Sequence, residues 1–249
     1  MIAHVVILGC GRSGTSIFGE LFEGLGPYRY LFEPAFADLA GVDYAAGPVA
    51  MKVPKVPLGT PMTPGLPFVL DELLRLVPEP RVLYWQVRHP LDAICSLRPG
   101  ISENWSHNPK PPSWQQLLER PLVERCAHHW AHINTHGYRA VAEHCEVNRF
   151  ESTVHQPQET ALRVCRQVGV NPADHESSIA DWVRRVGNRK TPDAYEARRQ
   201  VVWSRPDHQT RVERWRENLS AEDLDRVIPI VAEAAHSFDY ELPPHRPPA

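Results

Sequence analysis

The sequence predicts an α/β fold, a three-layer sandwich around a central parallel sheet of about five strands. A short apolar run over residues 4–8 ends in glycine and is typical of a buried strand, and apolar residues at helical spacing follow it over residues 15–25. Strand-like runs and helical patterns then alternate along the chain, as in parallel sheets that are covered on both faces. In such folds, ligands bind at the carboxyl ends of the strands.

The remaining elements continue this alternation. Strands are expected over residues 28–32, 49–53, 81–87 and 147–150, and helices over residues 66–77, from residue 90 to at least residue 97, over 157–168 and near the C-terminus. Pro121 should divide the apolar stripe of residues 114–145 into two helices. Ser220 is a good N-cap for the final helix, which Pro229 should bend.

The chain of 249 residues is long enough for one large domain, which we expect over residues 1–242. Residues 243–249 form a proline-rich tail that we expect to be disordered. Prolines also concentrate in residues 54–67 and 99–112. These two stretches are expected to be loops, and long loops in a compact domain are often functional.

The charge and the cysteines exclude several classes of protein. The formal net charge is −3, so no strong field favours nucleic acid. No segment reaches the roughly 20 apolar residues of a membrane span. The first residues lack Lys and Arg and lead directly into glycines rather than into a signal-peptide cleavage site. The five cysteines are scattered and form no C-x-x-C pair, which is typical of reduced thiols, so we expect a cytoplasmic protein.

The segment Gly9-Cys10-Gly11-Arg12-Ser13-Gly14-Thr15-Ser16 has the spacing of a phosphate-binding loop between a strand and a helix, which makes the predicted fold P-loop-like. Its glycines allow backbone N–H groups to turn toward an anion, and the helix N-terminus adds positive potential. Thr15 stands where nucleotide hydrolases carry a lysine, whereas the positive charge lies earlier, on Arg12. The loop therefore predicts an anion site, but not that of a typical nucleoside triphosphatase.

A second anion-binding element follows the strand over residues 81–87. Arg88 comes directly after this strand, and Ser96 lies eight residues later on the following helix. Arginine suits phosphate because its planar guanidinium can form two parallel hydrogen bonds. No Asp ends this strand to hold magnesium, as in phosphoryl-transfer enzymes.

These motifs resemble those of sulfotransferases that depend on 3′-phosphoadenosine-5′-phosphosulfate (PAPS). The loop from Gly11 to Ser16 is similar to the family's 5′-phosphosulfate-binding loop, and Arg88 with Ser96 is similar to its 3′-phosphate-binding element. The longer run through Phe32-Glu33-Pro34 resembles the carbohydrate 6-O-sulfotransferase branch in particular. His89 departs from the family pattern, which has Asp or Asn at this position.

The resemblance implies a metal-free transfer of a sulfuryl group from PAPS to an acceptor hydroxyl, on a sugar or on another small molecule, with 3′-phosphoadenosine-5′-phosphate (PAP) as product. It implies that Glu33 is the catalytic base and that Arg12 and Lys52 stabilise the developing charge, with Lys55 as a competing candidate for Lys52. The implied cofactor-binding residues are Arg12, Ser13, Gly14, Thr15, Ser16, Arg88, Ser96, Ser204 and Arg205, the last two in a closing segment near the C-terminus.

Two alternatives stay open: a P-loop kinase that acts on a small molecule, and a non-catalytic nucleotide-binding module. Thr15 and the missing acidic metal ligand disfavour the kinase. A histidine of the 99–112 loop, such as His107, is the alternative base. His128, His132 and His136 recur every four residues, a spacing that can bind metal, but they should face solvent, so no metal site is expected.

Overall fold

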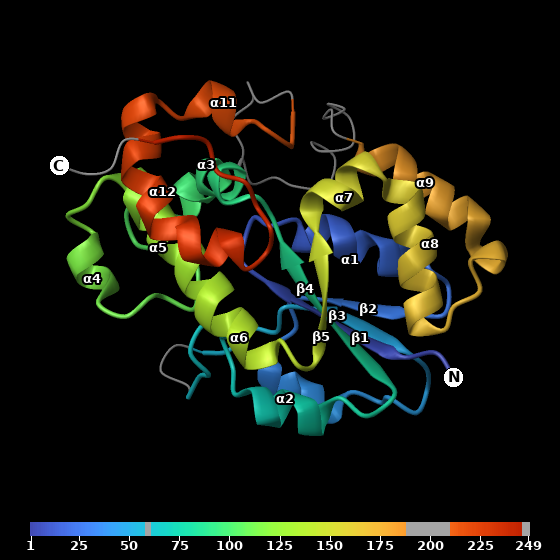
Figure 1. Ribbon diagram of the computed structural model, residues 1–249. Coiled ribbons are helices and arrows are strands. Elements are labelled where there is room, and N and C mark those ends of the chain that lie inside the picture. Colours follow the sequence, from blue (N-terminus) through green and yellow to red (C-terminus); the bar gives the residue numbers. More distant parts are fainter. Residues whose placement is uncertain (58–60, 188–209, 246–249) are drawn as a thin grey trace.

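The computed structural model describes residues 1–57, 61–187 and 210–245 of the chain. Five parallel strands form one sheet in the order β2-β3-β1-β4-β5, as the sequence predicts (Figure 1). The strands are β1 (His4–Gly9), β2 (Arg29–Phe32), β3 (Val49–Lys52), β4 (Arg81–Val87) and β5 (Cys145–Arg149). Because the chain runs from β1 out to the edge and then crosses to the other side of β1, the ends of β1 and β4 form a topological switch point.

Alternate residues of the strands face two helical layers. Val5 and Ile7 pack on α1 (Thr15–Gly24), α8 (Pro157–Val168) and α9 (Glu176–Val186). Val6 and Leu8 belong to a larger core with the helices of the opposite layer. That layer contains α2 (Leu70–Leu76), α3 (Pro90–Ile101), α5 (Leu122–His132) and α12 (Ala221–His236). Both faces of the sheet are therefore covered, which explains why residues 5–8 of β1 are all apolar.

Shorter elements connect these layers. They are the 3₁₀ turns η1 (Phe36–Gly41) and η3 (Pro172–His175), the π-helical turn η2 (Ile133–Gly137), and the short helices α4 (Trp114–Leu117), α6 (Tyr138–Val141), α7 (Phe150–His155) and α11 (Trp215–Asn218). The break at Pro121 lies between α4 and α5, as predicted. Ser220 caps α12 by accepting a hydrogen bond from the backbone N–H of Asp223, and the helix continues past Pro229.

Three element boundaries differ from those expected. The helix expected from residue 66 begins only at Leu70, because Leu66 precedes Pro67 and a residue before proline avoids helical geometry. Helix α3 continues through Pro99 to Ile101 and so takes in the start of the expected 99–112 loop. Strand β5 begins and ends earlier than expected, and Phe150 already belongs to α7.

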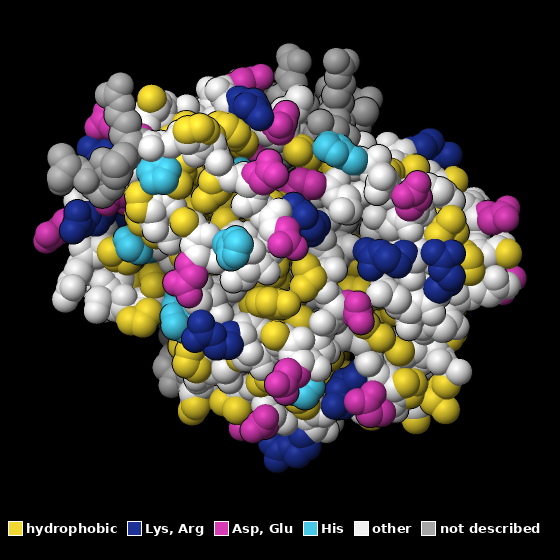
Figure 2. Space-filling model, viewed as in Figure 1, with side chains coloured by type: hydrophobic (Ala, Val, Ile, Leu, Met, Phe, Trp, Pro, Cys, Tyr) yellow, Lys and Arg dark blue, Asp and Glu magenta, His cyan; other side chains and the backbone are white. Residues whose placement is uncertain are grey.

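The described surface agrees with the composition. Figure 2 shows Lys and Arg side chains interspersed with Asp and Glu over the visible face, in keeping with the small net charge. All five cysteines are free thiols. Among the described residues, no helix is both long and apolar enough to cross a membrane. The domain boundary at residue 242 stays a prediction, and residues 246–249 of the expected tail lie outside the described residues.

Candidate anion-binding and group-transfer site

The glycine loop follows β1 at the centre of the sheet, and its backbone requires glycine at two positions. Gly9 has a φ of 134°, and a Cβ there would lie 2.2 Å from the carbonyl oxygen of Gln86 on β4. Gly14 has a φ of 90°, and a Cβ there would lie 2.2 Å from the ring of Phe150. These glycines let the chain turn tightly from β1 into α1.

No side chain of the described residues caps the end of α1 that faces this turn. Gly14 is the N-cap of the helix and offers no side-chain hydrogen bond to the first N–H groups. Ser13 is fully buried, and its hydroxyl has no hydrogen-bond partner among the described residues. Thr15 and Ser16 begin the helix. Unpaired donors at a helix N-terminus are the usual setting for a bound anion.

The two elements that the sequence predicts separately meet at this point. The Nε atom of Arg12 donates to the hydroxyl of Ser96 at 3.1 Å. Nη1 of Arg88 donates to the carbonyl oxygen of Arg12 at 3.2 Å. Arg88 and Ser96 are both buried, and the Arg88 guanidinium lies 4.5 Å from the ring centre of Phe150. The loop, Arg88 and Ser96 therefore form one site with two guanidinium groups.

Glu33 follows β2 and forms ion pairs with both candidate lysines. One carboxylate oxygen lies 2.5 Å from Nζ of Lys52, and the other pairs with Lys55. Lys52 is buried, whereas the side chain of Lys55 is 67% exposed. Burial alone would raise the pKa of Glu33, but the charges and hydrogen bonds of the two lysines outweigh it, so the pKa is lowered. Glu33 is thus a carboxylate at neutral pH.

One strand lies between the strand that precedes Glu33 and the strand that precedes the glycine loop, because β3 lies between β2 and β1. Lys52, at the end of β3, is the residue between them, since it pairs with Glu33 while its strand is bonded to β1. Lys52 therefore lies between the Glu33 carboxylate and the strand that leads into the loop.

His107 joins the site, although no motif marks it. Its ring packs against the loop, since a Cβ on Gly11 would lie 3.1 Å from its Nδ1 atom. Burial lowers the pKa of His107 to about 4, and the charge of Arg12 acts in the same direction. Glu33 opposes this shift and Lys52 supports it, so all three charged groups are close enough to act on the ring. His107 is therefore neutral at pH 7.

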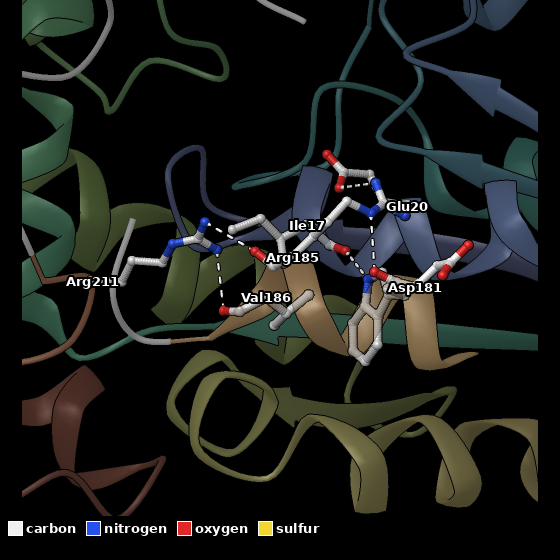
Figure 3. Close-up of polar contacts among 7 residues, drawn as sticks. Ile17, Glu20, Asp181, Arg185, Val186 and Arg211 are labelled. Atoms are coloured by element: carbon white, nitrogen blue, oxygen red, sulfur yellow. Dashed lines mark hydrogen bonds and ion pairs between the residues drawn. The ribbon is translucent and has the colours of Figure 1, made fainter. Parts of the chain in front are cut away.

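The segment expected to close over a nucleotide is described only in part. Ser204 and Arg205 lie outside the described residues. Just after residue 210, the guanidinium of Arg211 donates to the carbonyl oxygens of Val186 and Arg185 at 3.2 and 3.3 Å, at the C-terminal end of α9 (Figure 3).

Further contacts fix this part of the chain. Arg88 donates to the carbonyl oxygen of Arg211, so the C-terminal segment touches the anion site directly. Two contacts attach α9 to α1 (Figure 3). Arg185 pairs with Glu20 at 3.2 Å, and the indole N–H of Trp182 donates to the carbonyl oxygen of Ile17 at 2.8 Å.

The histidines of α5 and η2 do not assemble a metal site in the part of the chain that the structure describes, where no three potential ligand side chains gather. The rings of His132 and His136 lie 5.1 Å apart. His136 is exposed as expected, but His128 and His132 are half-buried, because the helix turns part of that face toward its neighbours.

No known family model matches the chain, and no curated protein matches it in sequence. Solved structures do match its fold. The sulfotransferase domain from the curacin biosynthetic pathway matches with a TM-score of 0.57 and 14% identity over 98% of this chain and 99% of that chain. Mouse sulfotransferase SULT7A1, complexed with PAP, matches with a TM-score of 0.59 and 14% identity over 96% of this chain and 85% of that chain.

A third structure is retinol dehydratase in complex with androsterone and the inactive cofactor PAP. It matches with a TM-score of 0.55 and 14% identity over 97% of this chain and 82% of that chain. Two of these three structures are complexes with PAP. The chain therefore shares the α/β fold of solved sulfotransferases over nearly its whole length.

Proposed function

We propose that the protein is a PAPS-dependent sulfotransferase that transfers a sulfuryl group to an acceptor hydroxyl. The observation that carries this proposal is the meeting of Arg12, Ser96 and Arg88 at the uncapped N-terminus of α1. Such a site offers two guanidinium groups and a helix N-terminus to a ligand with two separate anionic groups. The PAP-bound sulfotransferase of the same fold supports this ligand.

In the proposed complex, the 5′-phosphosulfate lies on the loop, where the amides, Ser13, Thr15 and Ser16 face it. The 3′-phosphate lies at Arg88 and Ser96. Ser204 and Arg205 would cover the nucleotide from the closing segment. The unpartnered hydroxyl of Ser13 supports a ligand at the loop, because a buried hydroxyl without a partner is costly.

The proposed reaction is an in-line transfer. The acceptor oxygen attacks sulfur, the bond from sulfur to the bridging phosphosulfate oxygen breaks, and the acceptor proton passes to Glu33. The products are a sulfate ester and PAP. Arg12, the loop amides and Lys52 stabilise the charge that develops on the leaving oxygen. The contact of the buried Lys52 with Glu33 supports this assignment, because it links the residue that accepts the proton to a residue that stabilises the leaving oxygen.

The acceptor class is proposed from the surroundings of Glu33. The ring of Phe32 is 54% exposed directly before Glu33, and Nζ of Lys52 lies 4.3 Å from its centre. Such a ring can stack on the flat apolar face of a sugar or of an aromatic natural product. The resemblance to the carbohydrate 6-O branch makes a sugar hydroxyl the first candidate. The free thiols agree with a cytoplasmic setting.

The decisive experiment uses the purified full chain, labelled PAPS and a panel of sugar and phenolic acceptors. We expect label transfer to at least one acceptor with release of PAP. In parallel, thermal unfolding with PAP is compared with thermal unfolding with ATP and magnesium. Stabilisation by ATP and magnesium but not by PAP would refute the proposal and favour a kinase. Binding of PAP without transfer to any acceptor or to water would favour a non-catalytic nucleotide-binding module.

A further inference from the structure

The ring of His107 lies in a slot between the glycine loop and α3. A Cβ on Gly100, in the last turn of α3, would lie 2.1 Å from Nε2 of His107, and a Cβ on Gly11 would lie 3.1 Å from its Nδ1. The backbone N–H and the hydroxyl of Ser106 both donate to the carbonyl oxygen of Gly100, at 2.8 and 2.9 Å. The ring therefore presents Nδ1 to the loop and Nε2 to α3.

His129 is a fully buried histidine whose protonation follows from its hydrogen bond. It lies on α5, which packs beside α3 (Figure 1). The indole N–H of Trp105 donates to its Nδ1 atom at 3.2 Å. Because an indole nitrogen only donates, Nδ1 of His129 must be an unprotonated acceptor, and the neutral imidazole then carries its proton on Nε2. His129 therefore offers an N–H group at Nε2.

Trp105 contacts His129 from a strained backbone conformation. Its φ is 43°, in the left-handed region that bulky side chains rarely adopt. Its ring is fully buried and packs edge-on against His129, with the ring centres 6.0 Å apart. Strain of this kind persists only where the surroundings over-determine it, and it is frequent at functional sites. The loop after α3 therefore keeps the indole on His129 despite the strain.

The two histidines are neighbours, and each has one buried nitrogen to satisfy. Their ring centres lie 5.7 Å apart. Nε2 of His129 and Nε2 of His107 are both enclosed, and neither has a hydrogen-bond partner among the described residues. A buried N–H without an acceptor is costly, and the His107 ring next to it can accept directly or through one water. His107 then accepts at Nε2 and carries its own proton on Nδ1.

We propose that Trp105, His129 and His107 form a chain of hydrogen bonds that fixes the proton of His107 on Nδ1, where it donates to an anionic oxygen at the glycine loop. His129 and Trp105 are the positioning residues. The inference rests on the proposed function, since the anion is the phosphosulfate of PAPS or the 5′-phosphate of PAP. A neutral donor suits this place, because Arg12 and Lys52 both disfavour a further positive charge on the ring.

The opposite tautomer would give His107 the opposite role. With its proton on Nε2, the imidazole would accept at Nδ1 and could take the proton of the acceptor hydroxyl as a base. Two variants separate the roles, because the side-chain amide of His107→Asn has its nitrogen at the position of Nδ1, whereas that of His107→Gln has it at the position of Nε2. Neither amide can act as a base at neutral pH.

The first test determines the tautomer by nitrogen NMR on the full chain with isotope-labelled histidine. The His107 signals are assigned by their loss in His107→Asn. We expect a protonated Nδ1 and an unprotonated Nε2, whereas the exposed His136 should exchange between both tautomers. Trp105→Phe removes the indole N–H and keeps an aromatic ring, so His107 should lose its preference for Nδ1. A proton fixed on Nε2 of His107 in the wild type would overturn the inference, even if Trp105→Phe does not fold.

The second test measures PAP affinity by calorimetry. His107→Gln should bind PAP about 10- to 100-fold more weakly, which is the usual worth of a charge-assisted hydrogen bond, whereas His107→Asn should stay within about threefold of wild type. His136→Asn is the matched control and should leave the affinity unchanged. Equal affinities of the Asn and Gln variants of His107 would reject the hydrogen bond from Nδ1. Unchanged PAP affinity in both, with turnover lost in both, would instead indicate a base.

The two tests distinguish this inference from the proposed function. If wild type binds PAP and transfers the sulfuryl group while His107 carries its proton on Nε2, the hydrogen-bond chain is rejected and the proposed function stands. If wild type does not bind PAP at all, the proposed function fails, and the role of His107 toward its ligand fails with it.

Discussion

Replacing Glu33 by glutamine tests the proposed base with the least change of shape. Glutamine keeps the length of the side chain and one carbonyl oxygen, but it cannot accept a proton at neutral pH. General-base catalysis contributes about 10²- to 10⁴-fold, and turnover should fall by this amount. Donor affinity should stay almost unchanged, because the residues proposed to hold the nucleotide, Arg12, Ser96 and Arg88, belong to the elements that follow β1 and β4 rather than to β2.

The ion pairs of Glu33 determine how the variant should fold. The variant removes the ion pair between Lys52 and Glu33 in a nearly buried position, where breaking a fully buried pair would cost about 3–5 kcal/mol. The Glu33 side chain is 24% exposed, so water can reach the pair and the loss should be well below that range. Lys55→Gln is the matched control, because it removes only the exposed partner, and turnover should change less than about fivefold.

The assay measures PAP release with an acceptor or, without one, the slow hydrolysis of PAPS by water. Circular dichroism and calorimetry on the same preparation report folding and donor affinity. Near-normal turnover in a well-folded Glu33→Gln protein would refute the assignment. His107, which lies against the loop, would then be the next candidate, and His107→Ala the next variant.

Three further predictions concern the nucleotide, metals and acid. Arg88→Ala should weaken PAP binding and leave adenosine-5′-phosphate nearly unaffected in calorimetry, and equal weakening of both would contradict the 3′-phosphate assignment. Activity should survive EDTA, because Arg12 and Lys52 are proposed to supply the charge stabilisation, and a loss restored by added divalent metal would overturn this mechanism. Burial lowers the pKa of both His107 and His132 to about 4, so the unfolded chain binds more protons between pH 6.5 and pH 4. Stability should be full above pH 6.5 and fall toward pH 4 by up to about 3 kcal/mol for the buried His107 and by clearly less for the half-buried His132, where water screens the charge. Urea unfolding can show this fall, and an unchanged slope in His107→Ala would contradict that residue's share.

The fold could be predicted from the sequence because the patterns that indicate its strands and helices each lie within a short stretch of the chain. The run before Gly9 and the helical spacing after Gly14 lie within one short stretch, and β4 matches its expected bounds at both ends. The anion loop and the pair of Arg88 and Ser96 are predictable for the same reason, since each is a motif of fixed spacing. The meeting of the two could only be expected from the rule that parallel strands end at one edge.

Other parts of the site depend on contacts between distant segments. His107 reaches the loop through tertiary packing, and it belongs to no motif in the chain. The insertion of β3 between β1 and β2 is a matter of strand order, which the hydrophobic pattern does not encode. The pairing of Glu33 with both lysines likewise follows from the register of β2 on β3 and the turn after it. Distances along the sequence therefore could not separate Lys52 from Lys55.

The place of Glu33 directly after β2 has a consequence for how such a protein can diverge. The anion loop and Arg88 follow central strands, where any insertion would disturb neighbours on both sides. Strand β2 lies at one edge of the sheet with β3 as its neighbour (Figure 1), and the chain after it continues into η1. Loops at such an edge tolerate changes of length and composition. Changes in the chain after β2 could therefore alter the acceptor of the proposed reaction, while the glycine loop and Arg88, which are proposed to bind the nucleotide, stay the same.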